Sequence, residues 1–319
     1  MYDPQAKKLN EQGTFKEIVV EISARQLSAK SETLRQMSMF LTQAVFMEVC
    51  VHPKPGLVTR HGSGAHTDMS ILTFAAGSAV LAKAFSDLQI LGMKHNGNYQ
   101  ELFGKVRRYG VSAEQELLRV TKGVNTQRGI LFAGGILAAA AGAALNKGLD
   151  SKALCDIVAE MTQGLTEKEL AGLLQQADRP LTAGERLYQA YGITGIRGEV
   201  EAGFPCVRQN GLPGLKEAFA KGAGLNDALV HALVHLMTVV QDSNVIWRGG
   251  YAKLPLVQQR ARDILAQGSI FTDSGRRLLA ESEELFRNER ISPGGSADLL
   301  SVTAALYLVE NKEFPVAII

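Results

Sequence analysis

Residues 226–240 read NDALVHALVHLMTVV, a stretch that is apolar on almost every side of a helix. A helix that is hydrophobic all round is buried among other helices. We therefore predict a helix here at the centre of the molecule. His231 and His235 stand one turn apart in it, a spacing seen in some zinc sites. Their apolar surroundings favour core histidines held by local hydrogen bonds.

Helical periodicity continues through most of the remaining chain. Apolar residues recur at i, i+3, i+4 and i+7, the pattern of one helix face. The runs cover about 34–51, 68–91, 129–146, 151–163, 226–240, 255–267, 274–287 and 296–309. Two-residue alternation is nearly absent, apart from one candidate extended stretch at 18–22. We predict an all-α fold: one large domain over residues 1–319, with 1–30 as a variable N-terminal segment, buried central helices and Gly-rich polar loops converging on one site.

The composition indicates an ordinary globular protein. Of 319 residues, 46% are hydrophobic and 21% charged, as in soluble domains with a large core. A net charge of +2 argues against a nucleic-acid binder, which usually concentrates excess Lys and Arg on one face. Three widely spaced cysteines without a C-x-x-C pair suggest neither a disulfide framework nor a zinc site. The cytoplasm is the expected location.

No membrane segment is expected. The N-terminus carries charges throughout and lacks the apolar region of a secretory signal. The longest uncharged apolar stretch, 130–145, has 16 residues, fewer than the ~20 that span a bilayer. We predict that this stretch is a helix of the protein core.

Five Gly-anchored polar clusters interrupt the helical pattern, each beside a helical run. Helix N-termini present free N–H groups and a partial positive charge, so Gly-rich turns leading into them suit phosphate. Three residues are N-cap types at expected helix starts: Thr126, Asn226 and Ser296. The clusters are PKPGLVTRHGSGAHTD (53–68), GVNTQRG (123–129), GIRGEVEAGFP (195–205), DSNVIWRGG (242–250) and SPGGSADLL (292–300).

The first cluster has the composition of a loop that carries charge. Pro55 restricts Lys54 to an extended geometry, so we expect the ammonium to project from a stiffened backbone. Arg60 adds a second cation. His66, two residues from Asp68, could serve as an acid, a base or a phosphate donor.

Several of the polar clusters contain carboxylates that could bind Mg²⁺ beside a phosphate. Glu199 and Glu201 face the same way on an extended segment but diverge by about 200° on a helix. Gly198 and Gly203 around them favour the extended or turn geometry, although a solvated charged loop is an equal alternative. Further candidates, whose alternative role is helix capping, are Asp68, Asp242 and Asp298.

Together the clusters resemble one family, the triphosphoribosyl-dephospho-CoA synthases. The resemblance spans about 45–310 and leaves out residues 1–30. Its matching strings are PKPGLV at 53–58, GAHTDM at 64–69, GVNTQRG at 123–129, RGEVEAGFP at 197–205, DSNVIWRGG at 242–250 and ISPGGSADLL at 291–300.

The resemblance implies an all-helical transferase that takes ATP and 3′-dephospho-CoA. It would join the ATP ribose to the 2′-hydroxyl of dephospho-CoA and release adenine, with Mg²⁺ as the expected cofactor. The product would be the prosthetic-group precursor 2′-(5″-triphosphoribosyl)-3′-dephospho-CoA. A further transferase would attach the group to the acyl carrier protein of citrate lyase or malonate decarboxylase. A homo-oligomer is compatible with the pattern.

We assign roles on this basis, leaving the general base open among Glu201, Asp242 and Asp298. The catalytic candidates are Glu199, Glu201, Asp242, Asp298 and His66. The Mg²⁺-ligand candidates are Asp68, Glu199 and Glu201. The substrate and phosphate-binding candidates are Lys54, Arg60, Asn125, Thr126, Arg128, Arg197, Asn244, Arg248, Gly294, Gly295 and Ser296.

The sequence departs from the family wording in four places. Thr59 stands where Asp is usual, Gln127 and Trp247 where His is common, and Arg128 where Lys is common. Two rival functions also remain open. An ATP- and Mg²⁺-dependent phosphotransferase would yield ADP or AMP, whereas a non-catalytic nucleotide-binding protein would show no turnover.

Overall fold

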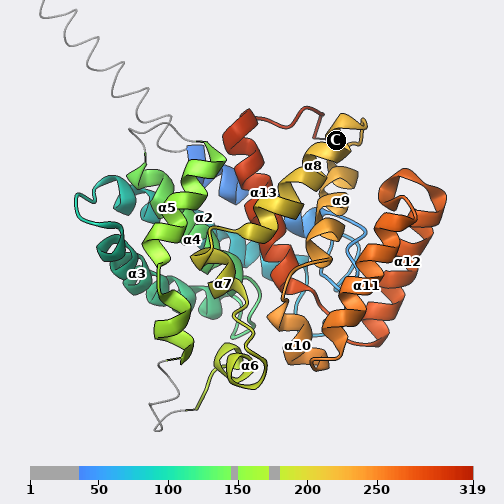
Figure 1. Cartoon of the computed structure of the whole chain (residues 1–319), viewed down its shortest axis with the longest axis horizontal. Helices are drawn as coiled ribbons and strands as arrows, with labels where there is room; N and C mark the ends of the chain where they lie inside the picture. Colours follow the sequence, from blue (N-terminus) through green and yellow to red (C-terminus); the bar gives the residue numbers. More distant parts are fainter. Residues whose placement is uncertain (1–35, 145–149, 172–179, 319) are drawn as a thin grey trace, which may run out of the picture.

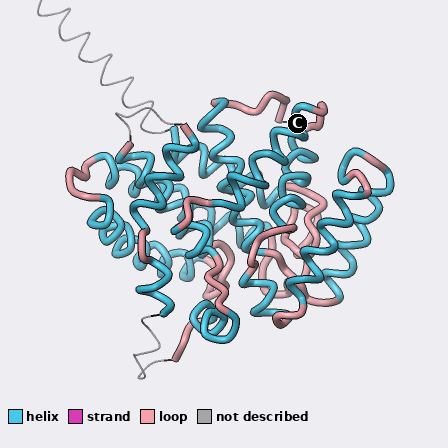
Figure 2. The backbone as a smooth tube through the Cα atoms, in the orientation of Figure 1, coloured by secondary structure: helices cyan, strands magenta, loops and turns pink. Residues whose placement is uncertain are grey.

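The computed structural model describes residues 36–144, 150–171 and 180–318. Within these ranges the chain is helical and contains no strand, apart from one isolated bridge between Thr59 and Gly62 (Figures 1 and 2). The predicted all-α class is confirmed. The candidate extended stretch at 18–22 lies outside the described residues.

The helices follow one another with short connections, apart from the long segment after the first. A helical segment over residues 36–50 comes first. It is followed by α2 Ile71–Met93, α3 Tyr99–Val120, α4 Arg128–Ala143, α5 Ser151–Thr162, the π-helix η1 Glu167–Ala171, α6 Ala183–Tyr191, α7 Ile196–Glu201, the π-helix η3 Val207–Gly211, α8 Leu212–Ala220, α9 Leu225–Met237, α10 Ser243–Gly249, α11 Lys253–Ala266, the 3₁₀ helix η4 Ser269–Phe271, α12 Asp273–Asn288 and α13 Gly294–Asn311.

The centre of the molecule is formed by the helices whose sequences are apolar all round. In α4 and α13 nearly every position beyond the first turn is buried, and α9 buries residues on all sides, including His231. One hydrophobic cluster extends through the sequence from Met37 to Phe314. In Figure 1, α3 and α5 lie on one side of this centre, and α11 and α12 lie on the other. The predicted central position of α9 is confirmed.

Small residues bring α2 and α4 into backbone contact. A Cβ on Gly92 would lie 2.0 Å from the Ala139 carbonyl oxygen, and one on Gly142 would lie 2.0 Å from the Gln89 carbonyl oxygen. By length and composition alone, α2 is apolar enough to cross a membrane. In this fold it buries a face that includes Leu81, Phe85 and Leu88. The stretch 130–142 is the core helix that the sequence predicts.

Several helices were not expected from the apolar pattern. The longest is α3, whose buried stripe contains only Leu102, Val106, Ala113 and Leu117 among many charged residues. Because α7 and α10 lie inside the polar clusters, their few apolar residues did not form a visible period. The remaining unexpected helices are α6 and α8.

The three predicted N-caps are wrong, and for Asn226 and Ser296 the reason is that tertiary contacts use the side chain. The residues at the N-cap positions of α4, α9 and α13 are Gln127, Gly224 and Pro293. The Ser296 hydroxyl donates instead to Asp242 at 3.0 Å. Asn226 donates to the His52 carbonyl at 2.7 Å, and Thr126 precedes α4 by two residues.

The loop between residue 50 and α2 packs against the segment that precedes α13. Gly56 has a φ of +75°, and a Cβ there would lie 2.1 Å from the Ile291 carbonyl oxygen. Both facts require glycine. A tight turn follows, closed by Thr59 N–H donating to the Gly62 carbonyl at 2.9 Å. This packing places His66 beside the start of α13.

Candidate active site

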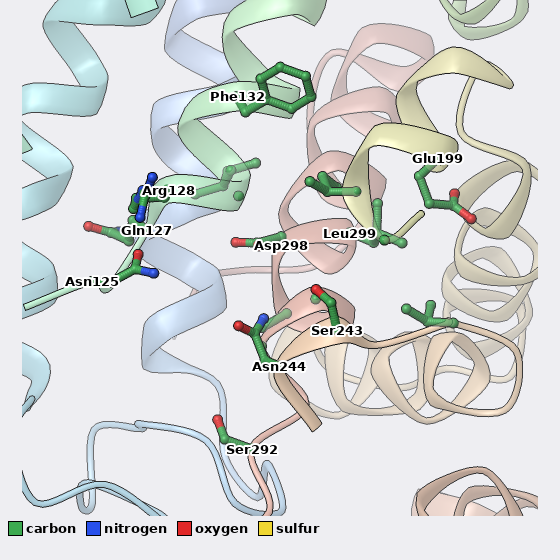
Figure 3. Close-up of a pocket in the computed structure, with 18 of the residues that line it drawn as sticks. Asn125, Gln127, Arg128, Phe132, Glu199, Ser243, Asn244, Ser292, Asp298 and Leu299 are labelled. Carbon is green, nitrogen blue, oxygen red and sulfur yellow. The ribbon is translucent and has the colours of Figure 1, made fainter. Parts of the chain in front are cut away.

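A cavity of about 580 Å³ opens where several helices begin. The first turns of α4, α6, α7, α10 and α13 all contribute lining residues. Figure 3 labels lining residues of α4, α7, α10 and α13. Because each Gly-rich cluster leads into a helix, the chain directs these N-termini at one space. Their free N–H groups and partial positive charges favour anionic groups. The predicted convergence of the polar loops is therefore confirmed.

Arginines from different helices line this cavity. Arg107 comes from α3, Arg128 from α4, Arg197 from α7 and Arg248 from α10. The Arg107 guanidinium carbon lies 5.5 Å from the centre of the Phe132 ring, a cation–π contact. Forked guanidinium groups match phosphate oxygens in geometry as well as charge. The cavity can therefore hold a ligand with several phosphates.

Carboxylates hold three of the arginines in place. Arg128 Nη2 lies 2.5 Å from Glu114 Oε1. Arg107 Nη2 lies 2.7 Å from Glu169 Oε1, and Arg197 Nε donates to Glu169 Oε2 at 2.9 Å. Each guanidinium has further N–H donors beyond those used here. The ion pairs thus orient the arginines and leave donors for a ligand.

Asp298 is a partly buried carboxylate in the second turn of α13, where it lines the cavity. It accepts a hydrogen bond from the backbone N–H of Ile130, in the first turn of α4. Burial, with Glu48 and Asp242 nearby, raises the pKa of Asp298 well above its usual value. Figure 3 shows Asp298 in the lining, between Gln127 and Leu299. A carboxylate with a raised pKa is a stronger base.

Asp242, another candidate base, ties two helices together. It caps α10 by accepting from the Asn244 and Val245 N–H groups at 3.0 and 3.4 Å. It also accepts from the Ser296 N–H at 2.8 Å and the Ser296 hydroxyl at 3.0 Å. Asp242 is buried and does not line the cavity. Its contacts are those of a structural helix cap. The Ser296 N–H and hydroxyl both donate to Asp242 and are therefore not free to bind phosphate.

The predicted extended geometry of Glu199 and Glu201 is wrong. Both lie on α7, so their side chains diverge. Glu199 lines the cavity and accepts from the Cys206 N–H at 3.2 Å, while burial raises its pKa. Glu201 is absent from the lining and accepts from the Thr166 N–H at 3.0 Å. Only one of the pair is available to a ligand in the cavity.

His66 reaches the cavity together with Arg248. Arg248 Nη1 donates to His66 Nδ1 at 2.9 Å, so the ring proton is on Nε2, which donates to Ser292 Oγ at 2.8 Å. Burial and the Arg248 charge lower the pKa of His66 to about 4. His66 is therefore neutral at pH 7. Asp68, with Oδ1 3.8 Å from Nδ1, is itself outside the lining.

The two cations of the first cluster do not face the cavity. Lys54, expected to project outward, is 1% exposed and forms a buried ion pair with Glu48. Its ammonium lies inside because Glu48, on the preceding helix, lines the cavity and needs a counter-charge. Arg60 Nη1 donates to the Cys50 carbonyl at 2.9 Å and to Asn226 Oδ1 at 3.0 Å. Neither cation is a lining residue.

The cluster before α4 supplies neutral polar groups. Asn125 and Thr126 line the cavity, as do Asn244, Gly294 and Gly295 beyond it. Among the described residues, the buried Thr126 hydroxyl has no hydrogen-bond partner. Buried polar groups without partners are costly unless a ligand satisfies them. Thr126 is thus suited to contact a bound molecule.

The structure shows the surroundings of the residues that depart from the family wording. Gln127 is buried, and its amide donates to Ser78 Oγ at 3.1 Å. Thr59 is buried in the tight turn, where its hydroxyl accepts from the His61 N–H at 3.1 Å. Trp247 is 52% exposed, beside Arg248.

Sequence reasoning missed lining residues that come from helices rather than from polar clusters. Glu48 belongs to an apolar run, and Arg107 and Glu114 belong to the helix that was not expected. A lone carboxylate in an otherwise buried helix face was the available signal for Glu48. Phe132 and Ser243 also line the cavity, and no pattern distinguished them.

A helical protein that directs helix N-termini, arginines and buried carboxylates at one cavity has the features of an enzyme for polyphosphate substrates. The comparisons specify the class. Residues 34–314 match the family of ATP:dephospho-CoA triphosphoribosyl transferases, and the chain belongs to this family.

Relatives of similar length bear the corresponding name. A 2-(5″-triphosphoribosyl)-3′-dephosphocoenzyme-A synthase from Klebsiella pneumoniae is 37% identical over 283 residues, covering 88% of this chain and 93% of its own. A relative from Malonomonas rubra, "Probable 2-(5″-triphosphoribosyl)-3′-dephosphocoenzyme-A synthase", is 38% identical over 281 residues, covering 88% and 89%. The crystal structure of a proposed synthase from Archaeoglobus fulgidus aligns with a TM-score of 0.44 at 18% identity, covering 75% of this chain and 100% of its own.

Proposed function

We propose that this enzyme joins the triphosphoribosyl group of ATP to the 2′-hydroxyl of 3′-dephospho-CoA and releases adenine. The observation that carries the proposal is the meeting of helix N-termini and arginines around the carboxylate of Asp298, whose pKa is raised. Family membership supports the same reaction. The site must hold a triphosphate intact while a bond at the ribose is exchanged. Its arginines can bind the triphosphate, and Asp298 can act as the base at the ribose.

The triphosphate binds Arg107, Arg128 and Arg197. A ligand of charge about −4 needs several cations, and fixed guanidinium groups provide them without reorganisation. The N-terminus of α4 adds N–H donors beside Arg128. The Thr126 hydroxyl completes this part of the site.

Asp298 accepts the proton of the attacking hydroxyl. The 2′-oxygen forms a bond to the anomeric carbon of the ATP ribose, and the bond from that carbon to the adenine nitrogen breaks. The electron pair leaves with adenine, which is then protonated. If displacement is direct, base and leaving group lie on opposite faces of the ribose, as in inverting glycosidases. Amides of Asn125 and Asn244 in the lining can stabilise the departing base.

A second phosphate-binding region is formed by Arg248, His66 and Ser292. Arg248 donates to the neutral imidazole of His66, and within the described part of the chain it forms no ion pair with a carboxylate, so its charge is available to a ligand. We assign the diphosphate of dephospho-CoA to this region. The substrates then approach Asp298 from different helices, α4 for ATP and α10 for dephospho-CoA.

Mg²⁺ fits Glu199. Among the described residues no cation pairs with this partly buried carboxylate, and burial raises its pKa. Mg²⁺ is commonly held by one or two carboxylates together with substrate phosphates. When bound, the ion would offset the negative charge of the triphosphate. Of the other candidates, Asp68 and Glu201 do not line the cavity.

The cellular role follows from the product. We place the enzyme in the cytoplasm, with its product passed to a transferase that modifies the acyl carrier protein of citrate lyase or malonate decarboxylase. Neither assignment depends on the geometry of the cavity. A homo-oligomer is compatible with the exposed apolar residues.

The deciding experiment incubates the enzyme with ATP, dephospho-CoA and Mg²⁺ and separates the products by chromatography. Equal amounts of adenine and of a triphosphoribosylated dephospho-CoA are expected. ADP or AMP as the nucleotide product would establish a phosphotransferase instead. Ligand-dependent thermal stabilisation without any turnover would establish a non-catalytic binding protein.

A further inference from the structure

A second cluster of titratable side chains lies where α8, α9 and η4 meet. Glu217 belongs to α8, and His231 and His235 stand one turn apart on α9. One ligand atom from each residue lies within 4.8 Å of the others. None of the three lines the active-site cavity, so the proposed reaction gives this cluster no role.

The spacing of the three ligand atoms is that of a metal site. The Nε2 atoms of His231 and His235 are 3.1 Å apart, and Glu217 Oε2 is 3.7 and 3.8 Å from them. Two imidazole nitrogens bound to one Zn²⁺ at about 2.0–2.1 Å lie roughly 3–3.4 Å from each other. We propose that Glu217, His231 and His235 bind a divalent transition-metal ion such as Zn²⁺, with water as the fourth ligand.

The surroundings fix both imidazole rings. His231 Nδ1 is 2.8 Å from Ser269 Oγ, the hydrogen bond that leaves Nε2 for a metal. The His235 ring lies against the backbone of α8, where a Cβ on Gly214 would be 2.7 Å from ring atom Cδ2. The ring of Phe271 meets that of His231 edge-on, with centroids 5.2 Å apart. Ordered rings reduce the entropy that metal binding would otherwise cost.

The charges and exposure are also compatible with an ion. His231 is buried and His235 half-buried, whereas Glu217 is open to solvent, which gives an entry path. Burial lowers the pKa of His231 to about 4, so the ring is neutral at pH 7, the form that binds metals. Lys221 pairs with Glu217 Oε1 at 2.6 Å. This pair leaves Oε2 as a single carboxylate ligand.

The same contacts could describe a simple hydrogen bond between the two rings. One Nε2–H would then donate to the other Nε2, and no metal would enter. In the metal-bound form both Nε2 atoms are deprotonated, and His235 carries its proton on Nδ1. Metal affinity distinguishes the two states directly.

A metal here would tether α8 to the last turn of α9. Val239, Val240 and Gln241, just beyond that turn, line the active-site cavity. The ion would thus stabilise the segment that connects α9 to α10 without contacting the substrates. Its effect should appear in thermal stability and metal content rather than in a catalytic step.

The test is calorimetric titration of the full-length, chelator-treated protein with ZnCl₂, followed by thermal melting with and without zinc. Wild type should bind one equivalent that is lost in Glu217→Ala and His235→Ala, and zinc should raise the melting temperature of wild type only. Ser269→Ala should bind about 10- to 100-fold more weakly. The matched control is His95→Ala, which removes an exposed histidine that contacts the Asn98 carbonyl.

Folding of each variant is checked without zinc by far-UV circular dichroism. Co²⁺ provides an independent signal, because a nitrogen- and oxygen-ligated tetrahedral site gives visible absorption that the two ligand variants should lack. If zinc binding is undetectable in wild type, or unchanged in both folded ligand variants, the three residues form only a hydrogen-bonded cluster. Neither result would bear on adenine release.

Discussion

The carboxylate of Asp298 occupies the space that a side chain at Gly129 would need. A Cβ built on Gly129 would lie 1.9 Å from Asp298 Oδ2. The Asp298 carboxylate can therefore lie against the first turn of α4 in this position only with glycine at 129. This contact connects the phosphate-binding end of α4 to the proposed base.

Gly129→Ala should lower activity by displacing Asp298. Gly110→Ala is the matched control, because that glycine also lies within a helix and nothing is within 4 Å of its added Cβ. Alanine at 110 should leave activity unchanged and stabilise the protein by up to about 1 kcal/mol. Steady-state kinetics and denaturant unfolding measure both effects. Full activity in Gly129→Ala would mean that the position of Asp298 is not critical.

Asp298→Asn should reduce kcat about 10²- to 10⁴-fold, the usual contribution of a general base. The pKa of Asp298 is higher in the folded protein than in the unfolded chain. As pH rises, the unfolded chain therefore releases this proton first, which lowers the free energy of unfolding of the wild type. The Asn variant should therefore be the more stable protein at pH 8, with the difference fading toward pH 4. Urea unfolding across this range checks the sign.

Asp242→Asn should affect stability more than catalysis, in contrast to Asp298→Asn. It removes a charged acceptor shared by Asn244, Val245 and Ser296. We expect a loss of about 1–3 kcal/mol in unfolding free energy and a smaller loss of kcat than in Asp298→Asn. A larger catalytic loss at position 242, in a folded protein, would reverse the two roles.

Glu199→Gln and Glu201→Gln form a matched pair on α7. The first should raise the Mg²⁺ concentration needed for half-maximal rate, because it removes a carboxylate from the cavity lining. The second should leave the Mg²⁺ dependence unchanged and lower stability, because Glu201 accepts from the Thr166 N–H. Rate measurements against Mg²⁺ concentration distinguish them. Identical Mg²⁺ curves for the two variants would remove Glu199 from the metal site.

Arg128→Ala should raise the KM for ATP and have less effect on that for dephospho-CoA. Loss of a charged hydrogen bond costs about 1.5–3 kcal/mol, or roughly 10- to 150-fold in affinity. Arg119→Ala removes an exposed arginine paired with Glu116 on α3 and should change neither constant. If dephospho-CoA binding suffers equally, Arg128 does not discriminate between the two substrates.

His66→Gln should make stability less dependent on pH. Burial and Arg248 lower the pKa of His66 in the native protein from 6.5 to about 4. Between these two pH values the imidazole is protonated in the unfolded chain but neutral in the native protein. Wild type then loses stability as pH falls from 6.5 toward 4. The stability difference between wild type and His66→Gln should shift in that window. A constant difference would show that His66 has the same pKa in the native protein as in the unfolded chain.

Much of the fold was predictable because helical periodicity depends only on residues that are close together in the sequence. Each apolar run that shows a helical period became a helix, and 226–240 became the buried α9. The missed helices have narrow stripes or few residues, as in α3 and α7, where the period is weak. The cap predictions failed because Asn226 and Ser296 contact residues far away in the sequence.

The sequence by itself determined the helical class, the polar clusters and the family, since periodicity and short motifs depend only on neighbouring residues. Tertiary structure alone decided which side chains meet. It turned Lys54 inward to Glu48, directed Glu201 away from the cavity and brought in Arg107 from a helix without a motif. Burial of charge is the physical reason: a buried ion must find its partner in space, and that partner can lie anywhere along the chain.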